Sequence, residues 1–311
     1  MADKAFEPAG MMGTQIFGLP VDRDTLFSNH QEIYKKRIEK RQRQLIVRLS
    51  FLKPFLKKGE KILLTTTGYS PINSLPQYVT GFFFVYLKRC LFVFTNFRIF
   101  HVPTTPIYKF KQSISQILYD DCQSIALKGG TLSVQYAKTG ITEKFKAIAL
   151  FERRKIKALV KKMPLPGTQS QLGRRSHICP RCTALLESGK YTCNTCQLKF
   201  KNKIVTYILA ILFPGGGYFY THHYFIGLIN VIVEIFLMGY LYLIWQDVVQ
   251  RPENRILYSV GLIAIFVVTK IIAVIHSSHF IEEFIPTQKQ IQTDPSAVRS
   301  RPPKKIKRQL F

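Results

Sequence analysis

Residues 81–103 read GFFFVYLKRCLFVFTNFRIFHVP. The stretch holds three apolar runs of seven residues each, rich in β-branched and aromatic side chains. Such runs predict strands, and the polar pieces Leu87-Lys88-Arg89 and Thr95-Asn96 predict tight turns between them. The centre of the chain is therefore expected to be an antiparallel β-meander.

Shorter strand-like runs continue this pattern on both sides. They are bounded by Gly, Asn, Asp or Pro and cover residues 60–68, 107–112, 116–126, 131–137 and 141–148. Residues 150–162 follow with a helical pattern, which two prolines end. Antiparallel strands followed by one helix predict that residues 54–164 form a small closed or half-closed β-barrel capped by that helix.

Two segments of this unit resemble bacterial PH-like and GRAM-like domains. The first is the entry FLKKGEKIL (55–63), and the second is the central run LFVFTNFRI (91–99). The resemblance implies a module that binds lipid, peptide or a second copy of itself and that is not an enzyme. No phosphoinositide-binding signature maps onto these residues, so no particular lipid is implied.

Four of the six cysteines form two CxxC pairs, Cys179/Cys182 and Cys193/Cys196, with ten residues between the pairs. Two such turns let four thiolates converge on one tetrahedral ion, and in a cytosolic chain they indicate metal rather than disulfides. The run CPRCTALLESGKYTCNTCQLKF resembles a zinc ribbon, which residues 179–203 would form. The expected cofactor is a structural Zn²⁺, with a rubredoxin-type iron centre and a redox dithiol pair as alternatives.

The N-terminal arm, residues 1–53, contains a basic amphipathic pattern over residues 28–52. Apolar residues at helical spacing share one face of this helix. Six cationic residues on its other faces are a candidate site for an anionic surface: Lys35, Lys36, Arg37, Lys40, Arg41 and Arg43. The helix is expected either to lie on anionic lipid or nucleic acid, or to pack its apolar stripe on the next domain with its charges in water.

After Lys203 the chain is nearly continuous hydrocarbon, and residues 204–285 are expected to form a membrane domain. Residues 224–245 and 256–275 each reach the roughly 20 residues that a spanning helix needs. Residues 204–220 are expected to be either a short first span or a re-entrant segment. The Lys and Arg residues of the flanks favour two spans with both termini in the cytosol, because two spans leave more of them inside.

The run Pro214-Gly215-Gly216-Gly217-Tyr218-Phe219-Tyr220 resembles small membrane domains of the TM2 type, which carry a PGxGxxY pattern. The following Thr221-His222-His223 departs from that pattern, because such domains often have a glycine and a basic residue there. The resemblance implies topology and little biochemistry.

Polar residues interrupt the expected spans. Glu234 and Lys270 lie at depths that differ by roughly 7 Å in an antiparallel helix pair. They are expected to form an interhelical ion pair, with an ion or proton path as the alternative. Other polar residues near the membrane surface either bind a divalent ion or contact water and headgroups; these are His222, His223, His276, His279, Glu282 and Glu283.

Charge is the chain's strongest compositional signal. Among 311 residues, 45 Lys and Arg face 18 Asp and Glu, which gives a net charge of +27 and predicts anionic partners. Residues 165–178 have the composition of a linker, and residues 286–311 have that of a basic disordered tail. The candidate anionic-surface residues of the tail are Lys304, Lys305, Lys307 and Arg308.

The sequence lacks the Walker, zinc-protease, serine-hydrolase and kinase signatures, which predicts a non-enzyme. The expected fold class is α+β and multidomain: a PH-like barrel, a four-cysteine ribbon and an α-helical membrane hairpin. With no secretory signal at its start, the chain is expected to be a multi-pass inner-membrane protein with cytosolic N-terminal domains. We expect an adaptor that binds anionic lipids or an unknown protein partner. The alternatives are a membrane-tethered nucleic-acid-binding protein and a small transporter or channel component, and the chain is compatible with a homo-oligomer.

Overall fold

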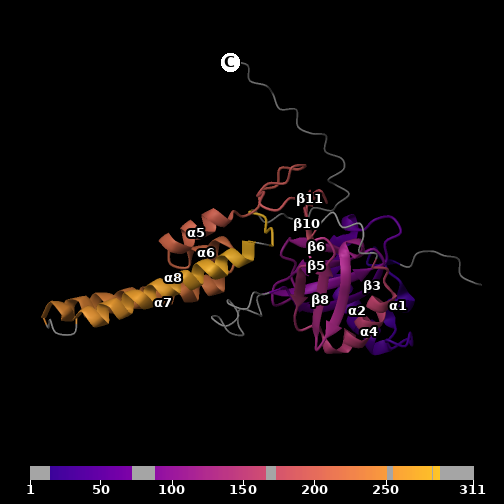
Figure 1. Cartoon of the computed structure of the whole chain (residues 1–311), viewed down its shortest axis with the longest axis horizontal. Helices are drawn as coiled ribbons and strands as arrows, with labels where there is room; N and C mark the ends of the chain where they lie inside the picture. The colour runs from indigo at the N-terminus through magenta and orange to yellow at the C-terminus, as the bar shows by residue number, and fades with distance from the viewer. Residues whose placement is uncertain (1–14, 72–87, 166–172, 251–254, 282, 288–311) are drawn as a thin grey trace, which may run out of the picture.

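The computed structural model describes residues 15–71, 88–165, 173–250, 255–281 and 283–287. A β-rich unit lies at one end, and the long helices α7 (Tyr224–Gln250) and α8 (Arg255–Ile281) project from it side by side (Figure 1). The chain is therefore α+β with antiparallel sheets, as the sequence predicts. The strand expected over residues 81–87 and the tail after residue 287 lie outside the described residues.

The larger sheet has six antiparallel strands in the order β11-β10-β6-β5-β4-β3. Strands β4 and β5 are buried on both faces, which explains why they read as continuous apolar runs. Phe92 and Phe94 of β4 enter one core, whereas Leu91 and Val93 enter the other, because successive side chains point to opposite faces. The strands are β3 Ile62–Tyr69, β4 Arg89–Thr95, β5 Arg98–Pro103, β6 Ile114–Leu118, β10 Ser176–Ile178 and β11 Leu185–Leu186.

A second sheet of three antiparallel strands shares the first of these cores with the larger sheet. Helix α4 (Leu150–Lys162) packs into the same core with Ile156, Leu159 and Val160. The three strands are β7 Cys122–Lys128, β8 Thr131–Tyr136 and β9 Thr142–Phe145. This part of the chain is therefore two facing sheets with a helix beside them.

The expected barrel closure is not formed in the described part of the chain. The two sheets share no continuous ladder there, and an isolated bridge between Tyr69 and Lys146 links the edge of β3 to the end of β9. The strand predicted over residues 116–126 is wrong at its centre, where the 3-10 turn η2 (Tyr119–Asp121) carries the chain from one sheet to the other. The Tyr119 hydroxyl donates to the Thr95 carbonyl at 2.9 Å, which holds this turn against β4.

Residues 107–112 are likewise not a strand. They belong to a loop between β5 and β6, in which the backbone amide of Lys111 donates to the carbonyl of Pro103 at 3.2 Å. A single bridge joins Thr104 to Phe110 across this loop. The β-branched residues at its centre are too few to sustain a ladder, and Pro106 has no backbone N–H to give one.

The N-terminal segment covers the second face of the larger sheet. The helix expected over residues 28–52 begins only at Lys36 and becomes a 3-10 helix after Ile46. Its start is displaced because the Asn29 side chain accepts from the amides of Gln31 and Ile33, which closes a turn there. The elements are β1 Gln15–Ile16, β2 Leu19–Pro20, α1 Arg23–Phe27, α2 Lys36–Ile46 and η1 Val47–Phe55.

The apolar stripe of α2 and η1 packs against the larger sheet. Leu45, Ile46, Leu49 and Leu52 are buried in the second core. The buried Gln42 side chain also pairs with the backbone of Thr65 in β3, at 2.8 Å and 3.0 Å. Of the two expectations for this helix, the structure therefore places its stripe on the neighbouring domain.

The expected linker over residues 165–178 is shorter than predicted. Its last residues form β10, which pairs with both β6 and β11. The cysteine-containing segment is therefore continuous with the larger sheet and is not a separate domain on a tether. Beyond it, the short helices α5 (Lys203–Leu212) and α6 (Gly216–Tyr220) pack beside α7 and α8 near the β-rich unit (Figure 1).

Candidate metal centre and charged sites

The four cysteines of the two CxxC pairs converge on one point. Their Sγ atoms all lie within 4.8 Å of one another, with Cys179–Cys196 and Cys182–Cys193 each at 3.5 Å. Four sulfurs at Zn–S bonds of about 2.3 Å are about 3.8 Å apart in a regular tetrahedron, which these separations bracket. The donor set therefore fits a tetrahedral metal ion, as the sequence predicts.

The two cysteine turns have the same local structure. In each, the amide of the first cysteine donates to the carbonyl of the residue five positions on, Ala184 at 2.8 Å or Leu198 at 2.9 Å. The residue four positions on, Thr183 or Gln197, has a positive φ and donates its amide back to the carbonyl of that first cysteine at 3.0 Å. The repeated geometry points both turns at one centre.

Backbone amides also point at the sulfurs. Burial raises the pKa of Cys193, but hydrogen bonds from the Cys196 and Thr195 amides outweigh it and lower that pKa to about 7. Burial raises the pKa of Cys182 to about 11 without a bound cation. A metal ion would supply the positive charge that holds all four groups as thiolates.

The four-cysteine cluster also connects the β-rich unit to the helix pair. Its first turn continues β10, and its second turn leads through Phe200 into α5. The chain after α8 returns to it: the Lys201 amide donates to the Ile285 carbonyl at 3.0 Å, and the Thr287 amide donates to the Lys199 carbonyl at 3.1 Å. The Phe200 ring packs edge-on against Phe284 at 5.7 Å.

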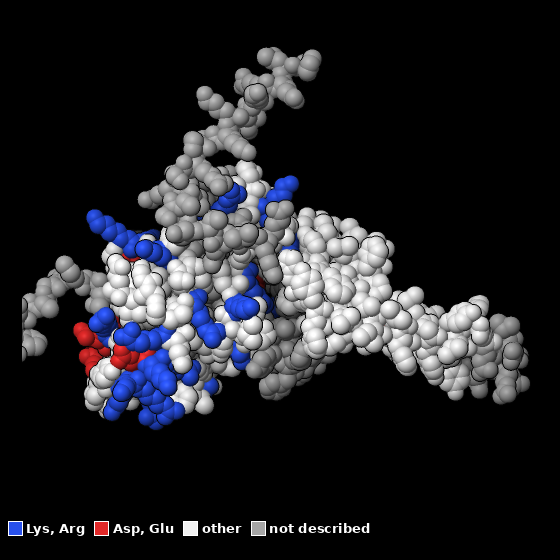
Figure 2. Space-filling view, turned by 180° about the vertical axis from the view of Figure 1, so that it is seen from behind, with Lys and Arg blue, Asp and Glu red and all other residues white. Residues whose placement is uncertain are grey.

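Helices α7 and α8 are long and apolar enough to cross a membrane. Their apolar segments are Tyr224–Gln246 and Leu257–Ser277, of which only 11% and 6% of the residues are buried in the protein. A core helix of a soluble protein would be mostly buried, so this exposure separates the two helices from that class. On the face seen in Figure 2, the described part of the pair shows no Lys, Arg, Asp or Glu side chain.

Aromatic rings mark both ends of α7. Tyr224 and Phe225 at its start and Tyr242 and Trp245 near its end are each more than half exposed. Tyr224 and Trp245 are 21 residues apart, which is about 32 Å along a helix. That length matches the hydrocarbon core of a bilayer, and such rings typically lie at its two interfaces.

Glu234 and Lys270 meet between α7 and α8. Lys270 Nζ lies 2.7 Å from Glu234 Oε2 and 3.3 Å from the Ala210 carbonyl near the end of α5. Asn230 donates to the other carboxylate oxygen at 2.5 Å. Glu234 is fully buried. Through the ion pair and the Ala210 carbonyl, helices α5, α7 and α8 are connected within mostly apolar surroundings.

The membrane-surface histidines do not converge on one centre. His276 lies 2.9 Å from the Tyr218 hydroxyl, and His222 lies 2.9 Å from the hydroxyl of Tyr224. Among the described side chains, the four cysteines are the one cluster spaced for a metal. The side chains of His279 and Glu282 lie outside the described residues.

The basic residues of α2 lie on the end of the β-rich unit away from the helix pair, where Figure 2 shows blue side chains gathered. Arg37 and Arg41 stack on the exposed ring of Phe151 in α4, at 5.0 Å and 5.5 Å from its centroid. Arg41 also pairs with the buried Glu152. We name the exposed cations at the start of α2 and along α2 and α4 the α2–α4 surface: Lys35, Lys36, Arg37, Lys40, Arg43, Arg154, Lys157, Lys161 and Lys162, of which Arg43 pairs with Glu39 and Lys162 with Glu32.

Sequence reasoning missed the contribution of α4 to this surface. The sequence predicts α4 only as a capping helix, but the spacing of Arg154, Lys157 and Lys161 places them on the side opposite Ile156 and indicates a basic face. The tail residues Lys304, Lys305, Lys307 and Arg308 lie outside the described part of the chain.

Sequence reasoning also missed a buried ion pair. Arg98 Nε and Nη2 bind the two oxygens of Glu60 at 3.0 Å and 2.8 Å, and both side chains are at most 5% exposed. Thr95 and the Lys57 amide each donate to Glu60 at 2.8 Å. The segments that carry the PH-like resemblance thus meet in one polar network.

A scan against protein-family models and searches of curated proteins and of solved structures found no match to this chain.

Proposed function

We propose that the protein is a non-enzymatic, membrane-anchored adaptor that holds a folded β-rich unit at the cytosolic face of the inner membrane. One observation carries the proposal. The chain segments before and after the exposed apolar helix pair both contact the four-cysteine cluster, and this cluster is continuous with the larger sheet. In the proposed arrangement, α7 and α8 cross the bilayer and the β-rich unit stays on one side of it.

The proposed metal is a structural Zn²⁺. Four sulfur donors with no open position are typical of structural zinc sites, whereas catalytic sites keep a position for water. Two of the four cysteines, Cys179 and Cys193, are buried, and the centre contacts Phe200 and Leu198 rather than a cleft. In this function the ion fixes the β-rich unit against the membrane helices and takes no part in chemistry.

The proposed partner is an anionic surface in the cytosol, with an acidic protein as the preferred class. The α2–α4 surface lies at the opposite end of the molecule from the helix pair. It therefore faces away from the bilayer that α7 and α8 would enter, which argues against the lipid of that leaflet as its ligand. The PH-like resemblance supports a binding module, and nucleic acid remains the rival polyanion.

The test uses the full chain in nanodiscs of zwitterionic lipid. Binding of polyglutamate and of duplex DNA is measured at low and high salt, with a triple variant of Lys36, Arg37 and Lys157 changed to Glu. We expect polyglutamate to bind and the variant to lose that binding. Tighter DNA binding that survives high salt would assign the surface to nucleic acid, and equal binding by the variant would refute the surface itself.

The anchor is tested separately by alkaline extraction of membranes. The protein should remain with the lipid, because two apolar helices resist extraction at high pH. Release into the supernatant would refute the membrane placement.

A further inference from the structure

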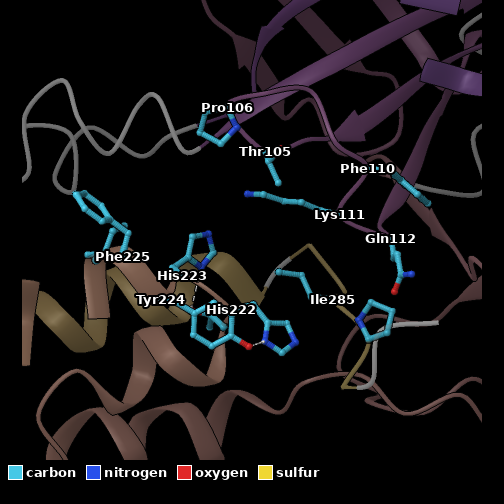
Figure 3. Close-up of a pocket in the computed structure, with 13 residues that line it drawn as sticks. Thr105, Pro106, Phe110, Lys111, Gln112, His222, His223, Tyr224, Phe225 and Ile285 are labelled. Carbon is cyan, nitrogen blue, oxygen red and sulfur yellow. Dashed lines mark hydrogen bonds between the residues drawn. The ribbon is translucent and has the colours of Figure 1, made fainter. Parts of the chain in front are cut away.

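A cavity of about 550 Å³ lies where the β-rich unit meets the base of the helix pair (Figure 3). One wall is the loop between β5 and β6, and the opposite wall is residues 221–226, where α6 turns into α7. Ile285 and Pro286, after α8, complete the lining. Its volume lies within the range of about 300–1,000 Å³ that ligand pockets occupy. The cavity is separate from the metal centre and from the α2–α4 surface.

The cavity lies at the level where a headgroup layer would begin. Tyr224 and Phe225 line it and are also the first residues of the apolar segment of α7. Tyr224 is 56% exposed and Phe225 is 65% exposed, so both rings reach outward from the cavity. Aromatic rings at a helix end typically lie among lipid headgroups.

The lining combines a cation and hydrogen-bond donors with apolar walls. None of its 13 residues is acidic. Lys111 extends across the cavity toward the side where His223 lies, and Thr105 projects beside it (Figure 3). The Thr221 hydroxyl donates to the Gly217 carbonyl at 3.0 Å and therefore accepts from His223 Nδ1 at 3.1 Å, which fixes the orientation of that ring.

Lys111 supplies the positive charge of the cavity lining. Burial lowers the pKa of Lys111, and the Glu283 carboxylate, which lies outside the lining, partly offsets this effect. Burial, together with the charges of Lys111 and Lys201, holds the pKa of His223 well below its usual value. An anion in the cavity would stabilise the charge of Lys111, as phosphate groups do for lysine elsewhere.

We propose that this cavity binds the phosphate group of a membrane phospholipid, with Lys111 as its counter-charge. The rings of Tyr224 and Phe225 lie against the first part of the acyl chains. This inference rests on the proposed insertion of α7 and α8 into a bilayer. A bound lipid would fill the gap between the β-rich unit and the helix pair and would fix the distance of that unit from the membrane surface.

The experiment counts lipids bound to full-length protein by native mass spectrometry in detergent. Three probes separate the sources: dioleoylphosphatidylglycerol, dioleoylglycerol with the same chains and no phosphate, and inorganic phosphate. The main variant is Lys111→Gln. The matched control is Lys109→Gln, which removes the same charge from an exposed position outside the lining. Lys111→Arg keeps the charge in place.

We expect phosphatidylglycerol to remain bound where dioleoylglycerol does not. Lys111→Gln should lower its binding about tenfold or more, the loss of one charge-assisted hydrogen bond, while Lys109→Gln and Lys111→Arg retain it. If Lys111→Gln does not fold, Phe225→Ala at the exposed mouth replaces it and should also weaken binding.

Two results would overturn the inference. Equal lipid binding by the two glutamine variants would show that the cavity is not the site, and displacement of the lipid by inorganic phosphate would assign the site to a soluble phosphate ester. Alkaline extraction distinguishes these from a failure of the proposed function. If wild-type protein leaves the membrane, the adaptor proposal and the lipid site both fail; if it stays and the variants bind alike, only the lipid site fails.

Discussion

Replacing Glu60 with Gln should strongly destabilise the β-rich unit. The carboxylate accepts four hydrogen bonds, two of them from the Arg98 guanidinium, and it is 1% exposed. Arg98 also donates to the Phe55 carbonyl at 2.7 Å and is held in place by it. The substitution keeps the shape of Glu60 but leaves a buried guanidinium without a counter-charge.

The cost of breaking one partner of such a buried pair is about 3–5 kcal/mol. A domain of this size has a free energy of unfolding of about 5–15 kcal/mol. The Glu60→Gln variant should therefore lose about a fifth or more of that stability, and its unfolded fraction should rise by about two to four orders of magnitude. Glu60→Leu with Arg98→Met removes both charges together and should recover much of the loss.

This change is measured in the full chain as the urea midpoint of thiol labelling at Cys90 and Cys122. Cys90 and Cys122 are fully buried in the β-rich unit, and burial raises the pKa of Cys122 to about 12, so both react only on unfolding. The matched control is Glu32→Gln, which breaks an exposed ion pair with Lys162 and should not shift the midpoint. A Glu60→Gln midpoint equal to that of the control would refute the assignment of this pair to stability.

The same pair predicts an acid dependence. Burial raises the pKa of Glu60, but hydrogen bonds from Arg98 and from the Lys57 amide hold it below its ordinary value of 4.5. The folded state therefore binds this proton less tightly than the unfolded state. Its contribution is complete well above pH 4.5 and is lost as the pH falls through the lowered folded value. The urea midpoint of wild type, followed by circular dichroism, should fall over that range, and this fall should be smaller in Glu60→Gln.

Three further changes test the metal centre and the helix pair. Cys182→Ser should reduce bound zinc from about one ion per chain to almost none, by elemental mass spectrometry, whereas Cys122→Ser should retain it; full retention by the first variant would refute the four-sulfur site. Gly217→Ala places a methyl 2.4 Å from Ser277 and should cost about 1–3 kcal/mol in a detergent unfolding assay, whereas Gly239→Ala, which meets nothing within 4 Å, should be neutral. Glu234→Gln should loosen the helix pair in the same assay, and a change in ion flux with unchanged stability would favour the transport alternative.

The features predictable from the sequence were those encoded locally. Two CxxC pairs place their own sulfurs, because each turn is built within six residues. The membrane-length helices follow from uninterrupted apolar composition, and the ion pair between Glu234 and Lys270 follows from helix rise in a tight hairpin. Each of these depends on one segment or on two segments joined by a short loop.

The features that the sequence did not predict depend on contacts between segments that are distant along the chain. The short sequence Tyr119-Asp120-Asp121 separates β6 from β7, and the turn there is held by the contact of Tyr119 with Thr95, 24 residues earlier. Residues 176–178 have the polar composition of a linker and become a strand because β6 offers an open edge. Glu60 and Arg98 were visible as a pattern, but their pairing across 38 residues follows only from the register of β3 and β4.

The short apolar helix α5 bears on the number of membrane spans. Helix α5 has ten residues, about 15 Å of rise, which is half of a bilayer core. At its end Gly215 adopts φ +65°, and a side chain there would meet the Gly227 backbone, so the chain turns back into α6 beside α7. The apolar residues of α5 nevertheless remain exposed, among them Ile211 and Leu212. Helix α5 is therefore apolar on its exposed face and too short to cross a bilayer, and the chain turns back after it. Such a helix is suited to the outer part of one leaflet. This favours the two-span arrangement, in which the chain enters and leaves the membrane on the side of the β-rich unit.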